Sequence, residues 1–588
     1  MKSIINKLFL GAALAAMAGM TSCVGDLDQL PTDPSTIMEP SFKENPREAI
    51  GAVMAKCYQG LAVSGQTGPD GDCDIKGIDG GTSQYTRGLF MMNEFTTDEV
   101  MWVYDDAGVP ELIKANWSSD NVVNYGIYSR FYVHIAVCNN FIKVARDLEK
   151  NGVEIGGTGP NAISQAEIDQ FVLEARALRA LSYYNIIDLW GRGVIAWDDM
   201  EFGERPEQAE SREALYNKVV KDLEEVLAAW PTNLNAGNVV YGRIGLDAVE
   251  ALLCRFYLNS KEWTGIDRYS DCYTHAQNII NRHKTGGFEF NGQPTGLAKS
   301  YLSLFCGTNK YFMPGGALPD QNEILWGIPY DEIYTQPYGG TTFLCNGAVL
   351  DAGSRDLSEG FCNISWYGLG NAWGCMHARQ QFAEKFNFID GSSNDERAYL
   401  WLTENAGMKI GNEDYADILD GYFSIKFTNL ACNPDGTMPL WKDPDNGLNR
   451  AGVTPIVSTQ YYPNTCLPLI RLADVYLMAA ECAVRGAGDK NEALNLVNAL
   501  RQRANVSLFA SGDLTLDNIL DERARELYWE CTRRTDLIRF GKFTSGYNWN
   551  WKGGAYVGRA IDDKYKLFPL PANVMAIYGS SMVQNPGY

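Results

Sequence analysis

The stretch that decides the fold runs from Leu467 to Phe540, near the C-terminal end of the chain. It begins LPLIRLADVYLMAAECAVRGAGDKNEALNLVNALRQRAN (467–505) and closes with ILDERARELYWECTRRTDLIRFG (519–541). Apolar residues recur in it every three or four positions, which is the spacing of one face of an α-helix. This spacing predicts three consecutive helices.

The first predicted helix is charged on one narrow side and apolar on the other. The charged side carries Arg471, Asp474, Glu481 and Arg485. The apolar side carries Ala473, Leu477, Ala480 and Val484. Because two of these apolar residues are alanines, we expect a neighbouring helix to approach closely.

Two further apolar rows follow the first helix. Gly486 and Gly488 end that helix, and Asp489 with Glu492 is a start of the capping-box type. The rows consist of Ala493, Leu496, Val497, Leu500 and Ala504, and of Leu520, Ala524, Leu527, Tyr528 and Cys531. A helix pair of roughly 34 residues is the tetratricopeptide unit, which buries its apolar face only against stacked neighbours. We therefore expect a mainly α fold built on a tetratricopeptide-like helical repeat scaffold.

Helical spacing also occurs in the first half of the chain. It predicts helices over residues 46–60, 125–148, 165–190, 211–230, 242–263 and 269–283. Between about 286 and 463 many glycine, proline and aromatic residues break this rhythm, which predicts loops, short strands and a few short helices. The scaffold is therefore expected to contain a large loop-rich insertion.

The N-terminus has the three zones of a secretory signal. An apolar run over residues 8–20 follows two lysines and leads directly to Cys23. Such a run is too short to span a bilayer as a helix. A cysteine in this place is typical of bacterial lipoproteins, so we predict a signal peptide over residues 1–22 and a lipid on Cys23. The short polar segment 23–45 suits a tether.

Composition limits the possible partners. The formal net charge is −22, which argues against nucleic acid as a partner, because phosphates require a basic surface. The same charge argues against direct binding to an anionic membrane surface. Apart from Cys23 there are thirteen cysteines without metal-binding spacing. We expect no full disulfide framework, and the sequence leaves open whether one or two disulfide bonds form.

Motifs for catalysis are missing from the sequence. The chain has four histidines, and it contains no HExxH, P-loop or GxSxG motif and no dinucleotide-binding glycine motif. We therefore expect no catalytic residues and no cofactor.

A weak calcium candidate lies in a Gly- and Asp-rich loop. Asp70, Asp72 and Asp74 alternate as calcium ligands do, but Ile75 and Gly81 stand where an EF-hand loop requires Gly and Glu. A solvated loop is the alternative interpretation.

Several segments resemble the SusD/RagB family, the nutrient-binding surface lipoproteins of Bacteroidota. They are LIRLADVYLMAAE, VNALRQRA, DERARELYWECTRRTDLIRFG, the tail FPLPANVMAIYGSSMVQNPGY, MMNEFTTDEVMWVYDDAG (91–108) and QFAEKFNFIDGSSNDERAYLW (381–401). The resemblance covers essentially the whole chain. It implies one SusD-like body over residues 46–588, with helical repeats at about 46–285 and 464–588 and a variable region at about 286–463.

The resemblance also implies that exposed aromatic residues bind the ligand. Sugar rings stack on aromatic faces, and their hydroxyls need amide, carboxylate or guanidinium partners. Aromatics interleaved with asparagines in the insertion fit this requirement, and related proteins present a platform aromatic in the region of Trp102. We therefore predict ligand binding by Trp102, Tyr104, Trp326, Trp366 and Trp373. For more than half of the insertion's aromatics, packing within the insertion is the alternative.

The function that the resemblance implies is nutrient capture. It implies a lipid-anchored protein, exposed at the cell surface on the outer membrane, that binds oligosaccharides and delivers them to a SusC-like TonB-dependent transporter. One alternative is a RagB-like uptake lipoprotein that binds peptides. Another is a secreted glycoside hydrolase, which would need two carboxylates roughly 5 to 10 Å apart across a cleft.

Overall fold

The computed structural model describes residues 39–65, 73–201, 203–231, 240–349, 364–388, 393–402, 421–438 and 461–588, the side chains of 39–41, 365–366 and 401–402 excepted. The chain divides into two compact units. Of the described residues, those of 39–53 and 147–167 form the first unit, and those of 54–146 and 168–588 form the second.

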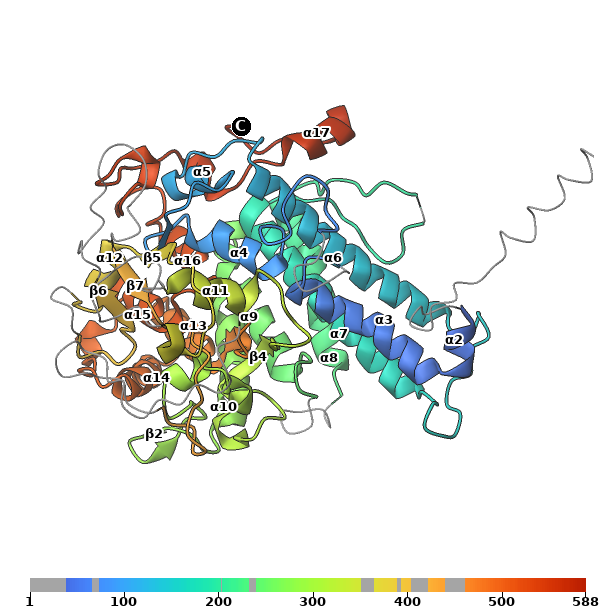
Figure 1. Ribbon diagram of the computed structural model, residues 1–588, viewed down its shortest axis with the longest axis horizontal. Coiled ribbons are helices and arrows are strands. Elements are labelled where there is room, and N and C mark those ends of the chain that lie inside the picture. Colours follow the sequence, from blue (N-terminus) through green and yellow to red (C-terminus); the bar gives the residue numbers. More distant parts are fainter. Residues whose placement is uncertain are drawn as a thin grey trace, which may run out of the picture. The chain divides into compact units, whose positions relative to one another are not determined.

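Most described elements are helices (Figure 1). In the first half they are α2 (Glu39–Glu44), α3 (Pro46–Ala62), α4 (Tyr85–Glu94), α5 (Val109–Lys114), α6 (Val122–Asp147), α7 (Gln165–Trp190), α8 (Arg212–Ala229), α9 (Leu246–Thr264) and α10 (Tyr269–His283). In the second half they are α11 (Gly340–Ala348), α12 (Gln380–Glu384), α13 (Leu472–Val484), α14 (Lys490–Arg503), α15 (Leu516–Leu527), α16 (Arg533–Arg539) and α17 (Ala572–Tyr578).

Surface contacts hold the first unit together. Arg47, in the first turn of α3, forms an ion pair with Glu167 at 2.6 Å, and both side chains are largely exposed. The Arg47 side chain also donates to the carbonyl of Ala162 at 2.9 Å. Ser164 begins α7 as a cap, because its side chain and that of Glu167 bond each other and each other's backbone amides.

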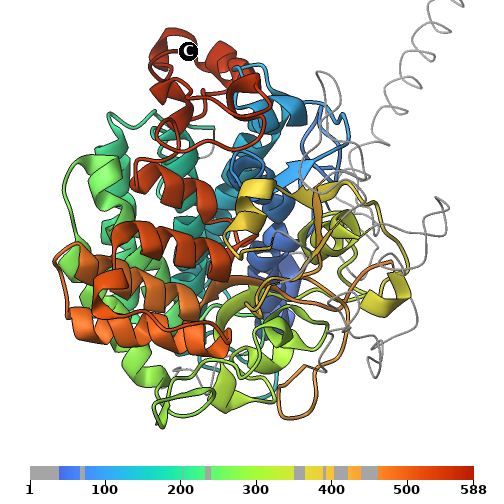
Figure 2. The same cartoon turned by 90° about the vertical axis from the view of Figure 1, so that its left-hand side faces the viewer.

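The second unit contains a continuous helical array. Helix α9 packs between α8 and α10, and α10 packs against α13, which in turn packs against α14 and α15. Figure 2 shows the orange C-terminal helices beside the green helices of the first half. Helices α10 and α13 are therefore neighbours in space, although the insertion separates them in sequence.

The predicted helices of the first half are confirmed. Helices α7 and α10 begin and end at the predicted residues, and α3, α6, α8 and α9 differ from their predicted bounds by a few residues. Repeated apolar spacing at 3.6 residues per turn was sufficient to find them, because each buries one face against a neighbour.

The C-terminal stretch differs from the prediction in two places. Residues Leu467–Arg471 form strand β8, which pairs antiparallel with β4 (Ile324–Ile328), so that α13 begins only at Leu472. Helix α15 ends at Leu527, because Trp529 and Cys531 adopt positive φ angles of 61° and 60°. A separate helix, α16, then follows, so the stretch holds four helices instead of three.

Short antiparallel strands organise the insertion. Strands β1 (Val100–Trp102), β5 (Met376–Ala378), β7 (Tyr422–Ser424) and β6 (Leu400–Leu402) form a sheet in the order β1-β5-β7-β6. Strands β2 (Glu289–Phe290) and β3 (Gln293–Pro294) form a separate hairpin. The four-stranded sheet thus joins β1, in the first half of the chain, to three strands of the insertion.

Helix α13 is buried on its charged side as well as on its apolar side. Asp474 pairs with Arg255 and Arg523, each at 2.9 Å, and Glu481 pairs with Arg539 at 2.8 Å. Both carboxylates are almost fully buried. The two arginines at Asp474 hold the pKa of that carboxyl at about 2 against the desolvation that burial imposes. The charges on α13 therefore join helices in the interior.

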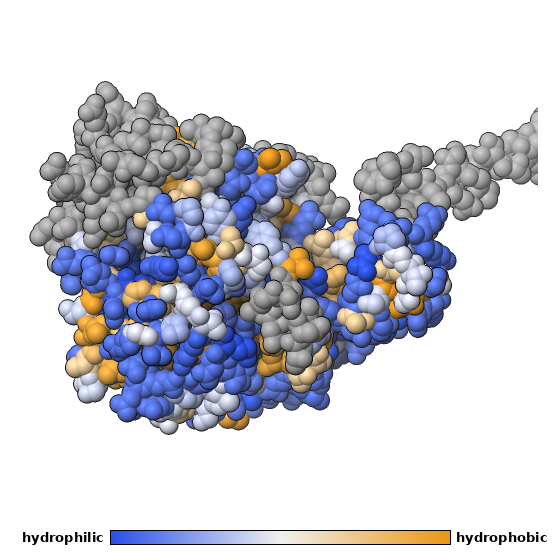
Figure 3. All heavy atoms as spheres, turned by 90° about the horizontal axis from the view of Figure 1, so that it is seen from below, coloured by the Kyte–Doolittle hydropathy of each residue, from blue (hydrophilic) through white to orange (hydrophobic). Residues whose placement is uncertain are grey.

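The surface seen in Figure 3 is mainly hydrophilic, with hydrophobic residues in small separate groups. Among the residues described, none of the helices combines the length and the apolar character that crossing a bilayer requires.

Candidate functional site

Five half-exposed aromatic residues come together beside the four-stranded sheet, and we call them the aromatic cluster. They are Tyr104, Tyr338, Trp373, Tyr461 and Tyr462. The ring centroid of Tyr338 lies 6.4 Å from that of Trp373, 5.9 Å from that of Tyr461 and 6.4 Å from that of Tyr462. The hydroxyl of Tyr104 donates to the carbonyl of Trp373 at 2.6 Å. Residues from four distant segments thus share one place on the surface.

Hydrogen bonds to Asn346 fix the positions of two of these aromatics. Asn346, at the end of α11, accepts a hydrogen bond from the Trp373 amide at 2.6 Å through its carbonyl. Its side-chain amide donates to the carbonyl of Tyr461 at 3.1 Å. Asn346 is fully buried, so one rigid residue connects the two arms that carry Trp373 and Tyr461.

A layer of buried aromatics lies beneath the cluster. Phe343 of α11 stacks on Trp102 with ring centroids 5.2 Å apart and lies 6.5 Å from Trp373. The guanidinium of Arg87 lies 4.7 Å from the Phe343 ring, and it donates to the Tyr338 carbonyl at 3.1 Å. Burial lowers the pKa of Arg87 from its ordinary value. The cluster therefore rests on a packed support that is itself tied to Tyr338.

The prediction that Trp102 is an exposed ligand platform is wrong. Trp102 is 2% exposed, and its indole N–H donates to Asp106 at 2.9 Å. It lies in β1, opposite Met376 of β5, and this pairing covers a side chain that the neighbouring acidic residues had suggested was in a loop. Its neighbour Tyr104 is 39% exposed and belongs to the cluster, where Trp102 only supports it.

The other three predicted tryptophans lie in different surroundings. Trp326 is 1% exposed in β4, and its indole donates to the carbonyl of Gly242, so it belongs to the core and its prediction is also wrong. Trp366 lies in the 3-10 turn Ile364–Tyr367, but its side chain is outside the described part of the chain. Trp373 is half-exposed in the cluster, where its role as a ligand residue stays a prediction.

Sequence reasoning missed Tyr461 and Tyr462. They stand as a YYP triplet at the end of the insertion, just before β8. Adjacent residues of an irregular segment show no periodicity, so the pattern of spacing could not mark them. The available signal was the pairing of two tyrosines immediately before a proline, which favours an extended backbone.

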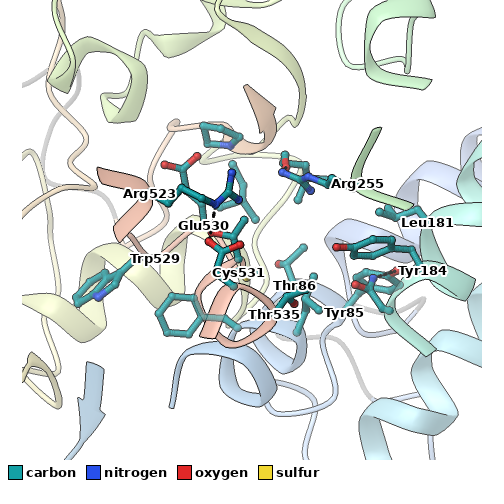
Figure 4. Close-up of a pocket in the computed structure, with 18 of the residues that line it drawn as sticks. Tyr85, Thr86, Leu181, Tyr184, Arg255, Arg523, Trp529, Glu530, Cys531 and Thr535 are labelled. Atoms are coloured by element: carbon teal, nitrogen blue, oxygen red, sulfur yellow. Dashed lines mark hydrogen bonds and ion pairs between the residues drawn. The ribbon is translucent and has the colours of Figure 1, made fainter. Parts of the chain in front are cut away.

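The helical array also encloses a small cavity of about 50 Å³. Figure 4 shows its lining, with Arg255, Arg523, Thr535 and Tyr184 turned toward the same space. The two guanidiniums are paired with the buried carboxylate of Asp474. A space of this size holds only about three or four water molecules, whereas ligand pockets occupy about 300–1,000 Å³. We assign the cavity to the interior of the scaffold.

A larger open groove of about 570 Å³ lies between the end of α12 and the α14–α15 connection. Its cations are paired: Lys385 with Asp521 at 2.8 Å, and Arg501 and Arg525 with Glu522 at 2.6 Å each. Its half-exposed ring, Phe509, is covered by the guanidinium of Arg501 at 3.9 Å. The groove thus lacks the open aromatic face of the cluster.

Two predicted sites depend on residues outside the described ranges. Cys23, Asp70 and Asp72 are not among the described residues, so the lipid anchor and most of the calcium candidate stay predictions. Asp74 is described, and its carboxylate pairs with Arg130 at 2.6 Å. Among the described residues, no group of three or more His, Cys, Asp or Glu side chains is arranged to hold a metal ion.

Comparison with known proteins places the chain among relatives of similar length. The profile described as the SusD family matches residues 351–588. Over 617 aligned residues the chain is 30% identical to the starch-binding protein SusD of Bacteroides thetaiotaomicron, with 99% of both chains covered.

Solved structures of similar fold cover most of the chain as well. Surface glycan-binding protein A from Bacteroides fluxus matches with a TM-score of 0.61 and 20% identity. The protein of the same name from Bacteroides thetaiotaomicron, in complex with laminarihexaose, matches with a TM-score of 0.58 and 21% identity. Each match covers 92% of this chain and 99% of the other. Whole-length sequence identity and a shared fold lead to one assignment: this chain belongs to the SusD family.

Proposed function

We propose that this protein is a cell-surface lipoprotein that binds an oligosaccharide at the aromatic cluster and delivers it to a SusC-like TonB-dependent transporter. The observation that carries the proposal is the cluster itself, in which Tyr104, Tyr338, Trp373, Tyr461 and Tyr462 are half-exposed on a fixed frame. The whole-length relationship to a starch-binding protein supports it.

The chemistry of the cluster suits a neutral, polar ligand with apolar ring faces. Aromatic rings provide large contact area at low cost in conformational entropy, and they stack on the C–H faces of sugars. The negative charge of the chain, −22, disfavours acidic ligands over neutral ones. An oligosaccharide that spans several rings fits both features.

Binding without hydrolysis is part of the proposal. The sequence has two pairs of adjacent aspartates, at 105–106 and at 562–563, and three of these four carboxylates make hydrogen bonds within the protein. Asp106 accepts the indole N–H of Trp102, and Asp562 accepts the backbone N–H of Lys564. A hydrogen bond from Thr544 lowers the pKa of Asp563, whereas a general acid would need a raised value.

The first prediction tests the cluster with two tyrosines of the same short segment. Tyr338→Ala removes one stacking partner, so we expect oligosaccharide affinity to fall about five-fold, which corresponds to about 1 kcal/mol. Tyr334→Ala is the matched control, because Tyr334 is 87% exposed and is not part of the cluster. Isothermal titration calorimetry with starch and laminarin oligosaccharides measures both variants.

Equal affinity loss in the two variants, or none in either, would contradict the assignment of the site. Tight binding of peptides without binding of any oligosaccharide would favour the RagB-like alternative instead. Release of reducing sugar during incubation with the oligosaccharides would show hydrolysis and overturn the binding-only proposal.

The second prediction concerns the anchor. A lipid on Cys23 would give this acidic body its membrane affinity, because each CH₂ group of an acyl chain buried in the bilayer contributes about 0.8 kcal/mol of binding free energy. We expect Cys23→Ala to move most of the protein from the membrane fraction to the soluble fraction. Fractionation in cells that lack the transporter measures this, with Cys73→Ala as the control. A Cys23→Ala protein that stays on the membrane would refute the anchor.

The third prediction concerns the transporter. A modest-affinity surface site loses its ligand quickly, so efficient uptake requires a transporter close by. We expect affinity purification in mild detergent to recover a TonB-dependent barrel in about equal amount with the lipoprotein. Recovery of the lipoprotein alone, together with uptake that is unaffected by its deletion, would count against delivery.

A further inference from the structure

Two cysteines that are far apart in sequence meet at the base of the insertion. Cys306 follows the 3-10 turn Leu302–Phe305, and Cys432 follows β7. Both side chains reach the same hydroxyl group, that of Thr308. The hydroxyl of Thr308 lies at both sulfurs, 3.4 Å from that of Cys306 and 3.1 Å from that of Cys432.

Backbone hydrogen bonds hold the two segments in place around this pair. The amide of Thr428 donates to the carbonyl of Phe305 at 3.0 Å, and the amide of Gly307 donates to the carbonyl of Leu430 at 2.8 Å. The amide of Cys432 also donates to the hydroxyl of Thr308 at 2.9 Å. These bonds hold the two segments against each other, and both sulfurs lie within hydrogen-bond distance of one Thr308 hydroxyl.

Other cysteine pairs in the described residues differ from this one in their surroundings. Cys272 of α10 and Cys482 of α13 also come from helices that pack together, but both are fully buried and burial raises the pKa of each thiol. Cys432 is 8% exposed, and the neighbouring Cys306 thiol, together with Thr308, lowers its pKa to about 7. The thiolate is the reactive form of cysteine, so Cys432 combines reactivity with a partner in contact.

We propose that Cys306 and Cys432 form a disulfide in the exported protein, with an external disulfide as the oxidant. The Cys432 thiolate attacks the external disulfide and releases one thiolate from it. The Cys306 thiol then loses its proton and attacks the sulfur of Cys432 in the mixed disulfide, releasing the second thiolate. Two protein thiols and one external disulfide thus become one protein disulfide and two external thiols. Oxidising compartments outside the cytoplasm are where such bonds persist.

The bond would fasten the segment that supports the aromatic cluster. Asn429 lies three residues before Cys432, and its side chain accepts from the amide of Asn464 at 2.8 Å and donates to the carbonyl of Gly368 at 3.0 Å. Asn464 closely follows the tyrosines at 461–462 in the chain, and Gly368 lies five residues before Trp373. A bond at Cys432 would therefore fix a shared support, and its formation does not depend on which ligand the cluster binds.

Peptide mapping of the full-length protein from its native membrane tests the proposal. Free thiols are alkylated under denaturing conditions before and after reduction, with and without prior incubation in oxidised glutathione at pH 7.5. We expect the Cys306 and Cys432 peptides to be recovered linked to each other and to separate on reduction. The Cys272 and Cys482 peptides, as the internal control, should be alkylated without reduction.

Thermal melting gives a second measurement. A bond that closes a loop of more than a hundred residues should raise the melting temperature by about 5 °C, so reductant should lower it by that amount in the parent and not in a Cys306→Ser, Cys432→Ser double variant. Complete alkylation of both cysteines in the parent after glutathione treatment would overturn the proposal. Peptide mapping of the parent decides the question even where the double variant fails to fold.

Discussion

Replacing Arg471 by methionine is expected to lower the free energy of unfolding by about 3–5 kcal/mol. The guanidinium of Arg471 is completely buried and pairs with Glu323, Glu526 and Glu530 at 2.7, 3.1 and 2.7 Å. Methionine fills a similar space but carries no charge. The three carboxylates would then lose a shared cation in an interior where water cannot replace it.

A matched surface arginine provides the control. Arg47 forms an ion pair with Glu167, but its side chain is 51% exposed, so Arg47→Met should cost less than about 1 kcal/mol. Urea unfolding of the parent and the two variants, followed by far-ultraviolet circular dichroism, measures both effects. Similar losses in the two variants would show that the buried network is not what stabilises the scaffold.

The helices could be predicted from sequence because their signal is local. Helices α7 and α10 repeat apolar residues at helical spacing from end to end, and the structure gives them the predicted bounds. Strand β8 was missed because its cause is not local. Its residues become a strand by pairing with β4, more than a hundred residues earlier in the chain.

The same reason separates the predicted site aromatics that are exposed from those that are buried. Trp102 is followed by Tyr104, two aspartates and a glycine, which favours a loop, but pairing of β1 with β5 buries it. Trp373 and Tyr104 were predicted from composition and resemblance, and the structure places them together. The composition of the sequence indicates which aromatic residues are candidates for ligand binding, whereas the long-range pairing of strands decides which of them face solvent.

The charged residues of α13 could be located from the sequence, but their environment could not be predicted. Their regular spacing was visible in the sequence, but their burial was not, because the partners Arg255, Arg523 and Arg539 lie on other elements. Buried ion pairs require several partners at once. The sequence of one helix therefore gives only one partner of each ion pair, and the packed structure is needed to identify the other.

Replacing Glu99 by glutamine is expected to stabilise the protein at alkaline pH. Glu99 is 1% exposed, directly before β1. Burial is the main cause that raises its pKa to about 8, and the nearby charge of Asp98 adds to it, although Arg533 opposes the change. Glu94 is buried close by, and its pKa is raised as well, chiefly by burial. We therefore expect the folded protein to hold a proton on Glu99 at neutral pH.

The sign of the pH dependence follows from where that proton is released. Unfolded, Glu99 loses its proton near pH 4.3, whereas the folded protein keeps it until about pH 8. Unfolding thus releases a proton over this interval, so Glu99 makes the protein less stable as pH rises from about 4.3 to about 8, and has a constant effect above it. Glutamine has no proton to release, and its side-chain oxygen can still accept the hydrogen bond that the Trp529 amide donates to Glu99 at 2.9 Å.

The measurement is the difference between Glu99→Gln and the parent in urea unfolding at pH 5 and at pH 8. Titrating groups away from Glu99 contribute equally to both proteins, so their effects cancel in this difference. Glu94 is the exception, because Glu99 helps to raise its pKa. We expect the variant to gain about 3 kcal/mol relative to the parent between the two pH values. The exposed residue Glu207 supplies the control variant, Glu207→Gln, which should show no such gain. A difference that is the same at pH 5 and pH 8 would mean that Glu99 is ionised in the folded protein, and that its burial is compensated by Arg533.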